Sequence, residues 1–423
     1  MVSKSPVYRI MSQRNFRLLF IGTTISLLGD QFALIAIPWL ALQLTNDPLA
    51  LGFVLALEGF PRAAIMLVGG AITDRISPRA IMLIADLLRF FLTSLIAFAV
   101  FTGAIQIWML YAFSLVFGLV SGFKVPAENS IVPMLVDTQD LQAGNSFMMG
   151  SAQIAQFVGP TIAGILIGQY SHSFFGIGMA YSINALGFAI SAICLWFIYT
   201  GDGHQPSSIT SGQESIWTSI LTGMKYVWTD EALLLIILVM AGLNILLIGP
   251  IMVGIPVLAD QRLPEGAMAF GLLISAYAGG NLIGNLIAGT VPRPCGNTMS
   301  AIFISFMMAF GIVIGMLGFI RSTWLDFILL LILGLGNGYL DVLLFTWLQL
   351  RVPAEMLGRM MSIVMFASYG LGPISQAISG AILKWSLDNL FIFAGTLVLL
   401  LTLWTVFQPA LRVFSEGLAT KKI

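Results

Sequence analysis

The stretch Gly118-Leu119-Val120-Ser121-Gly122 occurs a second time, 216 residues later, as Gly334-Leu335-Gly336-Asn337-Gly338. Other short stretches return at nearly the same offset: Ile37-Pro38 as Ile255-Pro256, and Gly159-Pro160 as Gly372-Pro373. The offset is about half of the chain, so the sequence consists of two homologous halves. Halves that repeat in parallel in a membrane begin on the same side, and each therefore holds an even number of spans.

The chain is strongly apolar: 58% of its 423 residues are hydrophobic, 9% are charged, and the mean hydropathy is +0.96. Soluble proteins carry roughly 25% charged residues, so this composition predicts a membrane protein. The formal net charge is zero, and no basic tail indicates nucleic acid as a partner. Two cysteines (Cys194, Cys295) and two histidines (His172, His204) form no metal-ligand or disulfide pattern, so we expect no metal or other cofactor.

Apolar runs of about 20 residues can cross the ~30 Å hydrocarbon core of a bilayer as helices. We expect two pseudo-symmetric six-helix bundles, 16–200 and 232–408, joined by a linker at 201–231 and flanked by tails at 1–15 and 409–423. The fold class is therefore an all-α membrane protein with twelve transmembrane helices. The expected spans lie near 16–44, 49–72, 80–102, 106–126, 141–169, 174–200, 232–258, 267–291, 299–320, 324–348, 356–384 and 389–408.

The positively charged residues predict how the bundles are oriented. Lys and Arg number 14 on the side that holds both termini, with Lys124 and Arg351 among them, and 3 on the opposite side. We therefore expect a multi-pass protein of the cell inner membrane with both termini in the cytoplasm. The basic start leads into an apolar run longer than that of a signal peptide, so it should remain as the first span.

A ten-residue stretch follows the second span: Gly70-Ala71-Ile72-Thr73-Asp74-Arg75-Ile76-Ser77-Pro78-Arg79. It resembles the G-x-x-x-D-R-x-G-R-K/R signature of the major facilitator superfamily and lies in the same loop, although Ser77 and Pro78 replace the usual Gly and Arg. Asp86 and Arg89 in the third span fit the same resemblance. The family implies twelve spans in two bundles, which agrees with the apolar runs.

Further stretches resemble the bacterial drug:proton antiporter group, a branch that includes macrolide efflux proteins and the enterobactin exporter. The resemblance implies a secondary active transporter that exports an amphiphilic small molecule, such as a drug or a siderophore, in exchange for protons. Alternating access between the two bundles would carry the exchange. The matching stretches are Leu28–Asp30, Ile37-Pro38, Pro48–Gly52, Ala143–Ser146, and the antiporter motif Gly159-Pro160 with Gly164.

Three charged residues, Asp30, Glu58 and Arg62, lie deep in the first two spans. A charge at the centre of a bilayer costs at least ~2.5 kcal/mol on insertion scales, so each should face a partner or a wet cavity. Burial and a neighbouring arginine act in opposite directions on a carboxylate's affinity for a proton. One hypothesis is that Asp30 or Glu58 carries a coupling proton and Arg62 tunes it. The alternative is a static ion cluster that holds the two spans together.

Other charges are candidates for a gate at the cytoplasmic ends of the helices. Alternatively, Arg75 and Arg79 only keep their loop in the cytoplasm. Asp86 and Arg89 are three residues apart, so they also fit a structural ion pair within one helix. Asp341 lies near Arg351 and Arg359. Its two alternative roles are an ion pair at the gate and a contact with the substrate. The candidate gate residues are Gly70, Asp74, Arg75, Arg79, Asp86, Arg89 and Asp341.

The family resemblance implies a substrate cavity lined by spans one, four, seven and ten. Aromatic and amide side chains there suit a large amphiphile. The candidates are Gln31, Tyr111, Phe117, Asn244, Asn337 and Tyr339. The glycines of the antiporter motif also have a purely structural interpretation as sites of close helix packing.

Other functions remain open at this level. A lipid or lysolipid flippase would use the same fold, and a channel or a non-transporting sensor is a more distant alternative. An enzyme is not expected, because the chain has no nucleotide-binding loop, histidine-rich motif or loop long enough for a catalytic subdomain. The expected partners are a small amphiphilic substrate, protons and membrane lipids, for a chain that acts as a monomer.

Overall fold

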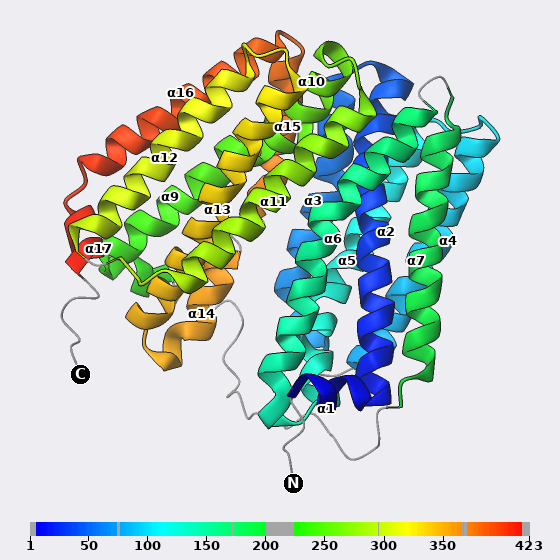
Figure 1. The fold of residues 1–423 in the computed structure, drawn as a ribbon, viewed down its shortest axis with the longest axis horizontal. Helices are drawn as coiled ribbons and strands as arrows, with labels where there is room; N and C mark the ends of the chain where they lie inside the picture. The colour runs from blue at the N-terminus through cyan, green and yellow to red at the C-terminus, as the bar shows by residue number, and fades with distance from the viewer. Residues whose placement is uncertain are drawn as a thin grey trace. The chain divides into compact units, whose positions relative to one another are not determined.

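The computed structural model describes residues 6–73, 77–170, 173–199, 224–294, 296–365, 367 and 370–416. Helices form nearly all of this part of the chain, and it contains no β-strand (Figure 1). The first half contains α1 (Pro6–Ser12), α2 (Arg14–Thr45), α3 (Pro48–Thr73), α4 (Pro78–Phe101), α5 (Ile107–Leu135), η1 (Thr138–Asp140), α6 (Leu141–Gln169) and α7 (Phe175–Phe197). The second contains α9 (Glu231–Gly249), η2 (Pro250–Gly254), α10 (Ile255–Arg262), α11 (Ala267–Thr290), α12 (Asn297–Leu317), α13 (Thr323–Arg351), α14 (Ala354–Met365), α15 (Gly372–Leu383), α16 (Leu387–Val406) and α17 (Ala410–Glu416).

Eleven helices in the described part of the chain are long and apolar enough to cross a membrane. They coincide with eleven of the twelve predicted spans, and one of them joins α9, η2 and α10 into a single run from Glu231 to Arg262. The remaining prediction, 356–384, covers α14 and α15, which are two shorter helices. Pro373 lies in the first turn of α15, where its missing N–H does no harm.

The helices group into two compact units, and each is described by itself. The N-terminal unit holds α2, α4 to α7, and α3 from Leu57 onward, together with residues 264–275 at the start of α11. The C-terminal unit holds the remaining helices of the second half, together with residues 47–56 at the start of α3. Each unit thus includes the beginning of the second span of the other half of the sequence.

The repeated glycines explain how helices cross in each unit. A Cβ atom added to Gly118 on α5 would lie 2.1 Å from the backbone oxygen of Glu58 on α3. A Cβ atom added to Gly334 on α13 would lie 2.0 Å from the backbone oxygen of Tyr277 on α11. Only glycine permits two helix backbones to approach this closely. The stretch that repeats in the sequence thus builds the same crossing twice.

Helix α1 lies across the ends of α2 and α6 in the N-terminal unit (Figure 1). Ile10 of α1 is fully buried in a cluster with Phe16 and Leu19 of α2 and Ile131 of α5. Arg9 of α1 also forms an ion pair of 2.5 Å with Asp140, the residue that precedes α6. This apolar cluster and ion pair fix one end of the unit, and the helices then run side by side toward the polar core described next.

Candidate functional site

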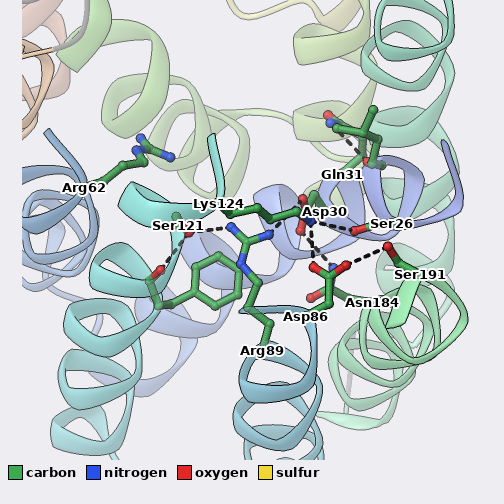
Figure 2. Close-up of polar contacts among 12 residues, drawn as sticks. Ser26, Asp30, Gln31, Arg62, Asp86, Arg89, Ser121, Lys124, Asn184 and Ser191 are labelled. Carbon is green, nitrogen blue, oxygen red and sulfur yellow. Dashed lines mark hydrogen bonds and ion pairs between the residues drawn. The ribbon is translucent and has the colours of Figure 1, made fainter. Parts of the chain in front are cut away.

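A buried ion pair joins α4 to α5 in the interior of the N-terminal unit. The Nζ atom of Lys124 lies 2.8 Å from Oδ1 of Asp86, and the two residues are 5% and 0% exposed. The hydroxyl group of Ser191 on α7 donates a hydrogen bond of 2.6 Å to the other oxygen of Asp86. Lys124 also donates to Ser26 on α2, over 3.3 Å. Four helices therefore contribute to one buried charged site (Figure 2).

The position of Lys124 corrects the prediction that placed it in a cytoplasmic loop. The fourth span is predicted near 106–126, and Lys124 is counted among the cytoplasmic charges. Helix α5 instead continues to Leu135 and includes both Pro126 and Pro133. The charge of Lys124 does not end the helix, because Asp86 offsets it inside the protein.

A second ion pair lies beside the first. Arg89 on α4 approaches Asp30 on α2, with 3.7 Å between Nη1 and Oδ2, and also donates a hydrogen bond to the hydroxyl group of Ser121 on α5. The side-chain amide of Asn184 on α7 donates to Asp30 over 3.3 Å. Gly29 makes this contact possible, because a Cβ atom there would lie 3.1 Å from the Cα atom of Asn184. Figure 2 shows both acids and both basic side chains in one cluster.

Aromatic rings cover the arginine. The guanidinium carbon of Arg89 lies 4.5 Å from the ring centre of Phe117 and 5.1 Å from that of Phe188. The ammonium group of Lys124 lies 5.6 Å from the ring centre of Phe188. Cations over aromatic faces are stabilised by the negative charge density of the ring, and the effect grows where water is excluded. Phe117, a predicted substrate contact, is therefore 6% exposed and packs on the ion cluster.

Glu128 adds a third carboxylate. It lies one helical turn after Lys124 on α5, and is close enough to Lys124, Asp86, Arg89 and Asp30 to interact with their charges. We call Asp30, Asp86, Arg89, Lys124 and Glu128 the ion network. With all five groups ionised, three negative charges face two positive charges, so the network has one acid in excess. Lys124 and Glu128 were missed as site residues, although two opposite charges four apart in an apolar helix are a signal for such a site.

The second repeat lacks these charges. The offset of the repeated glycines places Leu340 at the position of Lys124 and Leu344 at that of Glu128. Both leucines are buried, at 3% and 4% exposure. The two units thus share helix crossings but differ in their interiors, and the ion network belongs to the N-terminal unit.

The expected pair of Glu58 and Arg62 forms, but it lies apart from the ion network. Nη1 of Arg62 is 3.3 Å from Oε1 of Glu58, one turn away on α3, and the two side chains are 45% and 17% exposed. Figure 2 shows Arg62 well removed from Asp30 and its partners. The three deep charges of the first two spans therefore do not form one cluster, and Asp30 pairs with Arg89 of the third span.

The candidate gate residues separate into different environments. Asp86 and Arg89 each pair with a residue of another helix, so the structural pair considered for them is not formed. Arg79 donates hydrogen bonds of 2.8 and 2.7 Å to the backbone oxygens of Leu195 and Trp196, which end α7. A cation stabilises the exposed carbonyl groups of a helix end. Gly70 lies in the last turn of α3, and Asp74 and Arg75 lie outside the described residues.

In the C-terminal unit, Asp341 accepts a hydrogen bond of 3.0 Å from Asn337, one turn earlier on α13. Arg351, its expected partner, instead bonds both oxygens of Asp230, at 2.8 and 3.1 Å. Asp230 also accepts from the backbone N–H groups of Ala232 and Leu233 and so caps α9. Arg351 therefore joins the ends of α9 and α13, and the side chain of Arg359 lies outside the described residues.

The antiporter motif lies on α6 at two close helix contacts. A Cβ atom added to Gly159 would lie 2.5 Å from the Cβ atom of Gln31 on α2. One added to Gly164 would lie 2.7 Å from the backbone oxygen of Ala267 on α11. The N–H group of Thr161 also donates to the hydroxyl group of Ser275, over 3.0 Å. These contacts bear out the packing interpretation of the glycines.

The remaining cavity candidates are divided between the two units. Gln31 on α2 and Tyr111 on α5 belong to the N-terminal unit with Phe117. In the C-terminal unit, Asn244 donates to the backbone oxygen of Met240 over 2.9 Å, and the ring of Tyr339 lies 5.5 Å from that of Phe306. A shared role of these residues in one cavity stays a prediction.

The long apolar helices and the charged core define a polytopic membrane protein. A family model described as the Major Facilitator Superfamily matches residues 19–377, and the chain therefore belongs to this superfamily. The membership predicted from Gly70–Arg79 is confirmed. The protein is thus a multi-pass membrane transporter.

Known proteins resemble the chain over most of its length. Macrolide efflux protein A of Streptococcus pyogenes is 23% identical over 397 residues, covering 91% of this chain and 93% of that protein. Multidrug efflux pump Tap of Mycobacterium tuberculosis is 22% identical over 373 residues, covering 86% and 85%. The crystal structure of the nucleoside transporter NupG aligns with a TM-score of 0.71 at 14% identity, covering 93% of this chain and 98% of that one. Relatives of this transporter therefore include efflux proteins, and the fold is that of the superfamily.

Proposed function

We propose that this transporter exports an amphiphilic small molecule in exchange for protons by alternating access. It would act in the cell inner membrane with both termini in the cytoplasm, as the distribution of Lys and Arg predicts. The similarity to macrolide efflux protein A and to the pump Tap supports export. The ion network supports protons as the coupling ion, and it is the observation on which the proposal rests.

The charge balance of the ion network favours an exchangeable proton. Arg89 and Lys124 offset two of the three carboxylates, Asp30, Asp86 and Glu128. The acid in excess has no basic group of the network to offset it, which makes it the candidate carrier of the exchanged proton. When access to water changes sides, that proton can leave to the other compartment. A group that loads on one side and unloads on the other is what proton exchange requires.

The pair of Glu58 and Arg62 is a weaker candidate for the same role. Its two charges offset each other within one turn, and Arg62 is nearly half exposed. No acid is left in excess at that pair. Asp30, the third residue of the original hypothesis, remains in the proposal through its contact with Arg89.

The proposal is tested by the flow of protons in everted membrane vesicles with an acidic lumen. A pH-sensitive dye follows the lumen while an uncharged probe (Nile Red) or a cationic one (rhodamine 6G) is added outside. Exchange predicts that at least one probe speeds the loss of the pH gradient in vesicles that contain the protein. Vesicles without the protein are the control. A gradient that decays equally with and without both probes contradicts proton exchange.

A further inference from the structure

A groove of about 820 Å³ runs between α2 and α6 in the N-terminal unit. Phe20, Thr24 and Leu28 form its α2 side, at successive turns of the helix. Its α6 side includes Ser146 and Ile154. A volume of this size falls in the range of about 300–1,000 Å³ that is typical of sites for drug-sized molecules. The groove is therefore large enough for the kind of molecule that the proposed function requires.

The lining of the groove is apolar with scattered hydroxyl and amide groups. It includes no Asp, Glu, Lys or Arg among the described residues. The polar side chains of the lining are those of Thr24, Gln139, Gln142, Ser146 and Ser151. The lining thus suits an apolar molecule with a few polar groups and no charge.

One glycine opens the groove, and a second lies just beyond it. A Cβ atom added to Gly150, within the lining, would meet nothing within 4 Å, so this position opens onto free space. Gly159 lies further along α6, where it permits the close approach of the Gln31 side chain. The antiporter motif and Gln31 thus form a close contact one helical turn beyond Leu28 and Ala155, the last lining residues of the two helices.

We propose that this groove binds an uncharged amphiphilic molecule, and that this molecule is the exported cargo. The assignment rests on the proposed function and adds the place of binding and the charge of the substrate. A carboxylate in the wall would favour a cationic substrate, and the lining offers none. A phospholipid or lysolipid headgroup would bring charges that the lining does not offset.

Helix α2 connects the groove to the ion network. Thr24 and Leu28 face the groove, whereas Ser26 and Asp30 face Lys124 and Arg89. Residues two apart on an α-helix point about 200° apart, so the groove and the ion network lie on opposite sides of one helix. A cargo that displaces α2 changes the contacts of Asp30 directly. Binding of the cargo and binding of the proton therefore influence each other through helix α2.

Cysteine protection tests the binding site on the full-length protein in lipid nanodiscs. Gly150→Cys places a thiol in the groove, and its rate of labelling by a fluorescent maleimide is measured. Gly315→Cys on α12 is the matched control, because a Cβ atom there also meets nothing within 4 Å. The unmodified chain gives the background. Nile Red is the uncharged probe, rhodamine 6G the cation, and lysophosphatidylcholine the lipid.

At a Nile Red concentration ten times the dissociation constant of Nile Red, mass action leaves about a tenth of the sites empty. The proposal therefore predicts that Nile Red slows the labelling of Gly150→Cys about tenfold. Labelling of Gly315→Cys should be unchanged, and rhodamine 6G should protect neither thiol. Protection by rhodamine 6G or by lysophosphatidylcholine in place of Nile Red would overturn the assignment. So would a Gly150→Cys thiol that stays unlabelled in the empty protein, or one that Nile Red leaves fully reactive.

A blocked groove separates this proposal from the proposed function. Gly150→Phe fills the free space and should weaken Nile Red-dependent proton flux at least tenfold, whereas Gly315→Phe should not. Protection without any probe-dependent proton flux would support the groove and contradict proton exchange. Proton flux that persists in Gly150→Phe would support the exchange and contradict the groove.

Discussion

At the scale of single residues, the central feature is a set of charges that are held in an apolar interior by their partners. Asp86 has no exposed surface; Lys124 offsets its charge, and Ser191 donates a hydrogen bond to one of its oxygens. Removing water from two charges is costly, and their attraction compensates only when both are present. The protein is therefore expected to lose stability when one member of the pair is removed and to tolerate the removal of both.

We predict that Lys124→Met lowers the stability of the protein by about 3–5 kcal/mol, because it leaves the Asp86 carboxylate buried without its cation. The double variant Lys124→Met with Asp86→Asn should recover most of this loss. Thermal unfolding in detergent measures both effects. A double variant as unstable as the single one would show that the ion pair is not what Lys124 contributes.

Sequence reasoning found part of this site and missed the rest for a physical reason. Asp30 was identified because an ion inside a long apolar run is costly, and Asp86 and Arg89 were identified through the family resemblance. Their partners were not predictable, since Asp30 pairs with Arg89 on another helix rather than with its neighbours in the first two spans. Lys124 was counted among the cytoplasmic charges, whereas the structure buries it within α5.

At the scale of elements, pairs of helices cross where glycine removes the side chain. Gly118 brings α5 onto α3, and Gly334 brings α13 onto α11. The sequence repeat predicted two equivalent halves, and these crossings show what the repeated glycines do. Element ends were less predictable. Helix α5 continues past the predicted end of the fourth span, and the described part of the eleventh predicted span includes α14 and α15.

Gly118→Ala and Gly334→Ala should each destabilise the protein by about 1–3 kcal/mol, the usual cost of overpacking. The added methyl group would lie 2.1 and 2.0 Å from a backbone oxygen, so the helices must move apart. Gly315→Ala is the control, because its methyl group meets no atom within 4 Å. Melting temperatures of the three variants give the comparison. Equal stability of all three would contradict the close crossing.

At the scale of the whole molecule, the charge of the cargo decides which forces drive transport. An uncharged molecule that leaves as one proton enters moves one net charge across the membrane in each cycle. The membrane potential then contributes about 2.3 kcal/mol per 100 mV, or about 50-fold in the exchange equilibrium. A singly charged cation exchanged for one proton would move no net charge.

We therefore predict that a lumen-positive potential alone drives protons out of the lumen of proteoliposomes when Nile Red is added. Potassium gradients with valinomycin set the potential at equal pH on both sides, and a lumenal pH dye reports the flux. The direction of the potential matters, because a lumen-negative potential should suppress this outward proton flux. A flux that is indifferent to the potential would mean that the exchange is electroneutral and that the cargo carries charge.

The most direct test of the ion network is probe-dependent proton flux in Asp30→Asn, Asp86→Asn and Glu128→Gln, each with its expression and melting temperature measured. Arg62→Gln is the control, because Arg62 pairs with Glu58 and lies apart from Asp30 and its partners. If the network carries the exchanged proton, at least one acid variant will fold and lose the flux, and Arg62→Gln will retain it. If all three folded acid variants keep the wild-type flux, the ion network does not carry the proton.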